Sequence, residues 1–190
     1  MKIISRIFQK TAAPRPGRWM MWITCLTLGV ITARAPAQQD EPLAQVVEKE
    51  RVVEASRPPD RPWEPAEVGR DLVKRERVVA RDLSRAVVRL SGERLLRVNA
   101  NTQLVILPSL LKGRSLGLEL QKGEIYLHSR GARAELGLKT PVVRGLPNGT
   151  QFRVLVEDDG TTTFTMFEGT VELENEHGKL ELGNLEQAII

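Results

Sequence analysis

Short alternations of apolar and polar residues run from about Asp71 to Leu182, and turn-forming residues separate them roughly every 8 to 12 positions. Each alternation places its apolar side chains on one face of a strand. The apolar sets are Ala86, Val88 and Leu90; Leu96 and Val98; Leu104 to Leu107; Leu116, Leu118 and Leu120; Ile125 and Leu127; Phe152, Val154 and Val156; Phe164 and Met166; Val171 and Leu173; and Leu180 and Leu182. Helical periodicity is absent, so the pattern predicts an all-β domain over residues 70–190, a jelly-roll-like sandwich of antiparallel sheets.

Turn residues between these strands predict where the chain reverses. Glu157–Gly160, Glu168-Gly169 and Asn175–Gly178 each contain residues that tolerate hairpin geometry, and Gln121–Gly123 follows an apolar alternation in the same way. We therefore expect a meander of hairpins from Gln151 to Leu182.

A different composition precedes this region. Residues 38–69 are charged and contain Pro42, Pro58, Pro59, Pro62 and Pro65, with few apolar side chains. Such a stretch buries too little apolar area to offset the entropy lost on ordering, so we predict a disordered linker, with a short helix possible only over residues 43–55.

The first 37 residues have the features of an export signal. Six basic residues and no acidic residue flank an apolar run from Trp19 to Ile31, which is shorter than the roughly 20 residues that a membrane span needs. Small residues follow, and cleavage after Ala37 avoids a proline at the new terminus. Residues 1–37 are thus predicted to be a signal peptide, with Gln38 the first mature residue; the alternative is an inner-membrane anchor formed by residues 19–33.

Removal of this segment changes the charge balance. The whole chain has 28 basic and 24 acidic residues, a net charge of +4. Loss of the six basic residues leaves 22 basic and 24 acidic residues, a net charge of about −2. A nucleic-acid partner is therefore not expected. Cys25, the single cysteine, leaves with the signal, so the exported part has neither a disulfide nor a thiolate.

Candidates for catalysis are few. His128 alternates with Tyr126 on a predicted strand, and His177 lies in a predicted turn. Asp158-Asp159 resembles a carboxylate pair for acid–base or calcium chemistry, but a Glu-Asp-Asp-Gly hairpin needs such residues for its turn alone. Convergence of Glu124, His128 and the two aspartates would favour an enzyme. Without it, we predict no enzymatic activity, no cofactor and no metal.

Four short motifs occur in order in the second half of the chain. They are Leu120, Gly123, Glu124 and Tyr126; Thr140-Pro141; Gly149-Thr150 with Phe152; and Glu168-Gly169 with Val171. Physically, the glycines suit special backbone geometry, Thr-Pro fixes a strand start and Phe152 suits a core.

In order and spacing these motifs resemble the FecR domain family, the periplasmic sensing domain of bacterial regulators. The resemblance covers about the last hundred residues. Where relatives keep an extended apolar strand, residues 142–148 contain Gly145 and Pro147, which predict a loop or bulge. Sigma-regulating members carry a cytoplasmic domain before their membrane span, whereas about 18 residues precede the apolar run here, which disfavours direct sigma-factor regulation.

The resemblance implies non-covalent recognition of another envelope component, either a protein or a cell-wall glycan. Three interpretations stay open: an exported binding or sensing module, a membrane-anchored regulator in transmembrane signalling of the sigma/anti-sigma type, and a structural envelope scaffold. The last predicts self-association, and contact with a membrane is expected only through an uncleaved N-terminal segment.

Overall fold

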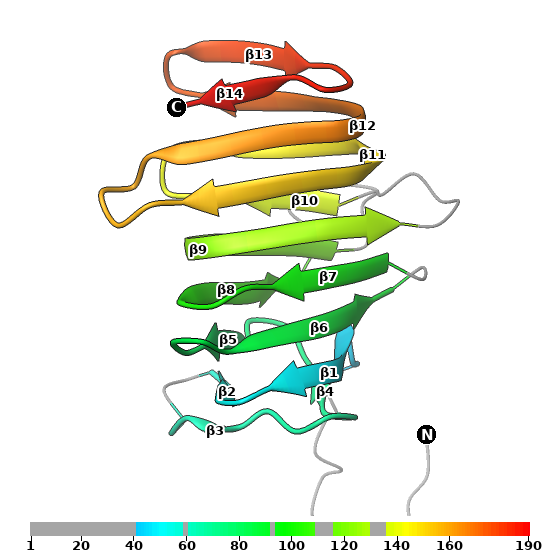
Figure 1. Ribbon diagram of the computed structural model, residues 1–190, viewed down its shortest axis with the longest axis vertical. Coiled ribbons are helices and arrows are strands. Elements are labelled where there is room, and N and C mark those ends of the chain that lie inside the picture. The colour runs from blue at the N-terminus through cyan, green and yellow to red at the C-terminus, as the bar shows by residue number, and fades with distance from the viewer. Residues whose placement is uncertain (1–40, 59–60, 92–93, 109–115, 130–135) are drawn as a thin grey trace, which may run out of the picture. The chain divides into compact units, whose positions relative to one another are not determined.

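The computed structural model describes residues 41–58, 61–91, 94–108, 116–129 and 136–190 (Figure 1). The chain divides into two units, Met1–Ala37 and Gln38–Ile190, and the described residues all belong to the second. The predicted signal peptide and its cleavage site lie outside the described residues.

Fourteen strands and no helix form in the described part of the chain, which confirms the all-β prediction. In chain order they are β1 (Ala44–Glu50), β2 (Val53–Ser56), β3 (Glu64–Pro65), β4 (Asp71–Leu72), β5 (Arg77–Ala80), β6 (Arg85–Leu90), β7 (Arg94–Val98), β8 (Thr102–Leu107), β9 (Leu116–Ser129), β10 (Leu136–Lys139), β11 (Arg144–Val156), β12 (Thr162–Asn175), β13 (Gly178–Leu182) and β14 (Gln187–Ile189).

The strands lie in two layers, called here the front and back sheets as they appear in Figure 1. The front sheet has the order β4-β1-β6-β7-β9-β11-β12-β14. The back sheet has the order β3-β2-β5-β8-β9-β10-β11-β12-β13. Of these pairs, β9 with β10 is parallel and the others are antiparallel.

Three long strands belong to both sheets. The first part of β9 pairs with β8 in the back sheet, and the part from Ile125 pairs with β7 in the front sheet. β11 and β12 cross together in the same way, with Gly149 of β11 opposite Gly169 of β12. The layers are therefore joined by bent strands, and the core lies between them.

Inward-facing side chains of both sheets form one continuous core. Phe152 and Phe164 are its largest fully buried members, and their rings stack with centroids 6.5 Å apart. Because inward and outward positions alternate along a strand, β7 shows strict buried-exposed alternation.

The prediction of a disordered linker over residues 38–69 is wrong for its larger part. β1 pairs with β6 and β2 pairs with β5, so the β fold begins at Ala44 instead of residue 70, and no helix forms over residues 43–55. Ala44, Val46, Val53 and Ala55 are buried. Few apolar residues suffice here because strands more than 20 residues later in the chain bond the backbone of each segment, and the inward side chains join the common core.

Two predicted turns are also wrong. The chain does not reverse at Gln121–Gly123 or at Glu168-Gly169; it bends there from one sheet to the other while the strand continues. The hairpins at Glu157–Gly160 and Asn175–Gly178 are confirmed.

Residues 144–148 are strand, not the predicted loop. Pro147 pairs with Val171 of β12, while on its other side β10 reaches only to Gly145. No ladder therefore requires an N–H from Pro147, and the register shift of β11 lies after Gly149 instead.

Candidate binding surface on the front sheet

Three motif glycines lie where strands cross between the sheets. Gly123 and Gly169 have φ angles of +88° and +107°, a region that favours glycine. A Cβ on Gly123 would collide with Thr102, and one on Gly169 would collide with the backbone of Gly149. Gly149 and Gly169 thus permit two adjacent backbones to bend together. The side chain of Thr150, which follows Gly149, is outside the described part.

Thr140-Pro141 forms the turn between β10 and β11. The Thr140 N–H donates to the Val143 carbonyl at 2.9 Å, and the Val143 N–H donates to the Thr140 hydroxyl oxygen at 3.2 Å. The Thr162 hydroxyl oxygen lies 3.3 Å from that of Thr140. The turn is closed on itself, and the buried Thr140 hydroxyl has hydrogen-bond partners.

The remaining motif residues divide between the core and the outer surface. Phe152 and Val171 are buried. Glu168 is exposed beside the bend of β12, whereas Glu124 and Tyr126 are half-buried on the outer face of the front sheet. The motif therefore marks the bends and the core, and only its acidic and tyrosine members reach the surface.

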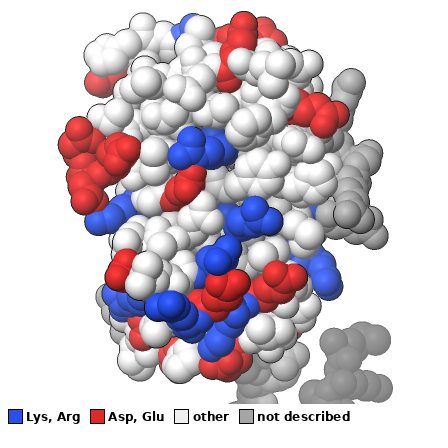
Figure 2. Space-filling view, in the orientation of Figure 1, with Lys and Arg blue, Asp and Glu red and all other residues white. Residues whose placement is uncertain are grey.

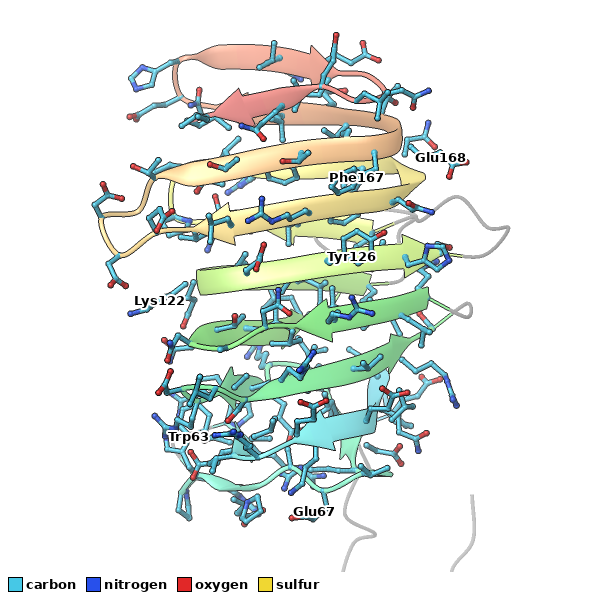
Figure 3. All side chains as sticks on the ribbon, in the orientation of Figure 1. Trp63, Glu67, Lys122, Tyr126, Phe167 and Glu168 are labelled. Atoms are coloured by element: carbon cyan, nitrogen blue, oxygen red, sulfur yellow. The ribbon has the colours of Figure 1, made fainter. Side chains whose placement is uncertain are left out.

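The outer face of the front sheet carries a row of side chains set by strand register. Tyr126 of β9 lies opposite Arg97 of β7 on one side and Arg153 of β11 on the other. The Tyr126 ring contacts the Phe167 ring at 5.9 Å between centroids, with 57° between their planes, and the Arg97 guanidinium lies 5.9 Å from the Tyr126 ring centroid. Figure 3 shows Tyr126 and Phe167 side by side on this face.

Together with Leu95, these residues form what we call the front-face strip: Leu95, Arg97, Tyr126, Arg153 and Phe167. Leu95 and Phe167 are 40% and 38% exposed, although both are large apolar side chains. Figure 2 shows a largely uncharged area near the middle of this face with basic side chains beside it. Such an arrangement of aromatic, aliphatic and arginine side chains is typical of a protein-binding surface.

The charge of this face is unbalanced toward positive. Arg153 forms an ion pair with Glu124, which also accepts a hydrogen bond from the Asn99 amide at 2.6 Å. Arg97 and its neighbour Arg89 form no ion pair with any residue that the structure describes. Arg97 in the strip and Arg89, opposite Leu95 beside it, therefore offer two guanidinium groups that a partner carboxylate can pair with.

The candidate catalytic residues are not brought together. Asp158 pairs with Lys122, while Asp159 accepts the Thr161 N–H at 2.9 Å within its hairpin. That hydrogen bond holds the pKa of Asp159 below its ordinary value. His128 lies opposite Gln151, four residues along β9 from Glu124, a separation of about 13 Å at the rise of a strand. Glu124 itself is occupied by Arg153 and Asn99.

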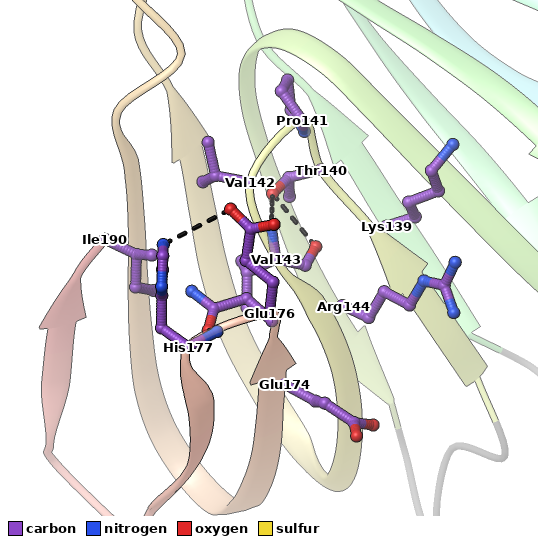
Figure 4. A pocket seen from close by; sticks show the side chains of 11 residues that line it. Lys139, Thr140, Pro141, Val142, Val143, Arg144, Glu174, Glu176, His177 and Ile190 are labelled. Atoms are coloured by element: carbon purple, nitrogen blue, oxygen red, sulfur yellow. Dashed lines mark hydrogen bonds and ion pairs between the residues drawn. The ribbon is translucent and has the colours of Figure 1, made fainter.

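A hollow of about 760 Å³ lies beside the Thr140-Pro141 turn (Figure 4). Its other wall is the hairpin from Glu174 to His177, and Ile190 closes one side. His177 and Glu176 pair at 3.4 Å with both side chains more than 80% exposed. The charged side chains of the hairpin wall, Glu174, Glu176 and His177, are each more than half exposed, so the strip is the stronger candidate.

No group of three potential metal-ligating residues occurs among the residues that the structure describes. Nor does that part of the chain hold a helix of the length and apolarity needed to span a bilayer.

The strip depends on residues that sequence reasoning did not single out. Leu95 and Arg97 stand on β7 and Phe167 stands on β12, and only the register of β7, β9, β11 and β12 brings them around Tyr126. One signal was present: in the predicted strands these side chains alternate with core residues, so large apolar groups at Leu95 and Phe167 fall on the outer face.

Comparison with known proteins agrees with this fold. Two crystal structures of a candidate anti-sigma factor from Parabacteroides distasonis align with 60% of this chain and 54% of theirs, each with a TM-score of 0.52, at 18% and 19% identity. The chain thus spans about half the length of those proteins. No curated protein matches it. The model of the FecR protein family matches residues 76–172, from the residue before β5 through most of β12. This match covers half of the sequence and includes all four motifs, and the chain therefore belongs to the FecR family.

Proposed function

We propose that this chain is a non-catalytic binding module of FecR-type regulatory signalling, located outside the cytoplasm, which recognises an envelope protein through the front-face strip. The observation that carries the proposal is the exposure of Leu95 and Phe167 around Tyr126 and Arg97. Membership of the FecR family and the fold shared with a candidate anti-sigma factor support the regulatory role.

The geometry of the strip favours a protein over a glycan. Arg97 covers one side of the Tyr126 ring, and Phe167 is tilted by 57° against it, so the two rings offer no flat platform for a sugar. Arginine, tyrosine and phenylalanine are enriched in protein interfaces, where a few such residues supply most of the binding energy. A partner with carboxylates around an apolar centre fits Arg89, Arg97 and Leu95.

The polar residues favour binding over catalysis. Each carboxylate that sequence analysis considered already has a partner of its own, Lys122 for Asp158, the Thr161 N–H for Asp159, and Arg153 with Asn99 for Glu124. A reaction centre needs a base and a nucleophile within hydrogen-bond reach of one point.

A photo-crosslinking amino acid at position 167 of the full chain, in cells that normally produce it, tests the proposal. We expect a covalent adduct with one protein, and Arg97→Ala should reduce its yield about tenfold, as for an interface hot spot of roughly 1.4 kcal/mol. The matched control is position 83, because Leu83 is 65% exposed and lies outside the strip. Equal labelling at both positions, or adducts with cell-wall glycan only, would contradict a protein partner.

Export is tested separately by intact mass and fractionation of the chain expressed with its own N-terminus in a bacterial host. A mature species that begins at Gln38 in the soluble envelope fraction is the expected result. A full-length species in the membrane pellet would instead identify an anchored regulator, with residues 19–33 as the anchor.

A further inference from the structure

One edge of the back sheet is open. β13 pairs with β12 on one side and with no other strand that the structure describes, and Figure 1 shows it at the end of the stack. The strand has five residues and contains no proline, and Leu180 at its centre is 49% exposed. An edge of this kind presents backbone N–H and C=O groups that another strand can bind.

The direction of these backbone groups follows from the hairpin. Asn175 and Gly178 flank a two-residue turn and form its closing pair. Residues of an antiparallel pair alternate between those that bond to the partner strand and those whose groups point away. Counting from Gly178, the residues of β13 with outward N–H and C=O groups are Lys179 and Glu181.

From this edge we infer a homodimer, in which β13 pairs antiparallel with β13 of a second copy about a two-fold axis through Leu180. Only residues whose backbone N–H and C=O groups point outward can bond across the edge. Three registers therefore place Lys179 or Glu181 of one copy opposite Lys179 or Glu181 of the other. Two of them set lysine against lysine or glutamate against glutamate. The third sets Lys179 of each copy against Glu181 of the other, with Leu180 facing Leu180, and this register is self-complementary as a two-fold interface requires.

The neighbouring residues support the same register. Glu172 of β12 lies directly opposite Glu181, an unfavourable pair of like charges. Lys179 lies 3.1 Å from Glu172 and 3.4 Å from Glu174 and offsets part of this repulsion within one copy. In the dimer, Lys179 of the second copy lies next to Glu181, so the pair of Glu172 and Glu181 in each copy gains a neighbouring positive charge. The two Leu180 side chains, next to Leu173, cover each other.

The pairing joins one five-residue strand from each copy. Stable interfaces bury about 1,200 Å² or more, and a single short edge provides less. We therefore expect a reversible dimer, which a covalent trap at the axis detects.

A cysteine at the axis tests the register. In the full chain with Cys25→Ser, we expect Leu180→Cys to form a disulfide-linked dimer under mild oxidation, because facing residues of a non-bonded antiparallel pair have Cα atoms about 4.5 Å apart, within disulfide range. Leu185→Cys is the control, since Leu185 is 83% exposed in the turn after β13 and lies off the axis. About tenfold more dimer is expected at position 180 than at 185. Equal yields, or no dimer at position 180, would overturn the proposal.

Charge exchange provides an independent arm. In the Leu180→Cys background, Lys179→Glu and Glu181→Lys each place like charges across the axis, so each alone should lower the yield of dimer about fivefold or more. When the two variants are produced together with different tags, each charge again meets its opposite, and the mixed dimer should return to the parental yield. Unchanged yields for the single variants, or a mixed dimer as weak as the single ones, would overturn the register.

Discussion

The edge strands at the two ends of the double-layered fold differ in length and in proline content. At the N-terminal end, β3 and β4 have two residues each, and Pro58, Pro62 and Pro65 lie in or beside β3. At the C-terminal end, β13 has five residues without proline. Short strands and prolines prevent the addition of a further strand. The contrast indicates that one end is blocked and the other is available for pairing.

Charges differ between the ends as well. At the N-terminal end, Glu76 is fully buried, binds Arg70 at 2.8 Å and accepts the Val73 N–H at 2.9 Å. At the same end, the Arg77 guanidinium carbon lies 5.4 Å from the centroid of the Trp63 ring. At the C-terminal end, Lys179, Glu172 and Glu174 are about half exposed. Buried ion pairs fix a structure because breaking them is costly, whereas exposed pairs leave groups available for exchange with a partner.

The largest effect is expected from Gly169→Ala, which would break the C-terminal end. β12 supports β13 through one half and β14 through the other, and Gly169 lies between the halves. A methyl group there meets the backbone of Gly149 at a φ of +107°, so we expect a loss of about 4 kcal/mol in unfolding free energy from strain and overpacking together. Urea unfolding measures it.

Gly160→Ala is the matched control for this change. Gly160 also has a positive φ, +90°, but no atom lies within 4 Å of a Cβ at that position. We expect a loss of about 1 kcal/mol from backbone strain alone. Equal losses for the two variants would show that the close contact of Gly149 with Gly169 does not limit stability.

The second effect concerns the blocked end. Glu76→Ala removes the carboxylate and leaves the half-buried Arg70 without its principal partner, so a loss of about 3 kcal/mol is expected. Glu64→Ala removes the other carboxylate bound to Arg70, which is 59% exposed and 3.4 Å away, and should cost less than about 1 kcal/mol. The same urea experiment compares them, and a larger loss for Glu64→Ala would contradict the role of the buried pair.

Sequence reasoning worked where information is local. Val154 and Phe164 belong to apolar alternations on either side of Glu157–Gly160, and these local residues alone predict the hairpin of β11 and β12. It failed at Gly169, because a glycine at a bend and a glycine in a hairpin look alike until the opposing Gly149 is known. It failed for β1 and β2 because their partners, β6 and β5, lie far along the chain.

The same limit applies to the front-face strip. Tyr126 was identified as a motif residue and His128 as a neighbour on its face, but Phe167 is 41 positions away in sequence. A strand sequence specifies which side chains share a face, and it does not specify which side chains of the next strand stand beside them.

The smallest effect is expected at the open end, in the titration of Lys179. A hydrogen bond from its ammonium group to Glu172, followed by the charge of Glu174, raises the pKa of Lys179 above its ordinary value. Because the pKa of Lys179 is higher in the folded than in the unfolded chain, its ion pairs stabilise the fold. This stabilisation is fully present below the pKa of an unfolded lysine and is lost as pH rises through the folded-state pKa. Glu172→Gln should therefore lower the pKa of Lys179 more than Glu174→Gln does, as followed by the NMR signals of the lysine side-chain methylene. A larger drop in the pKa with Glu174→Gln would mean that charge, and not the hydrogen bond to Glu172, orients Lys179. In that case the ammonium group could turn toward Glu181 of a second copy without losing a directional bond.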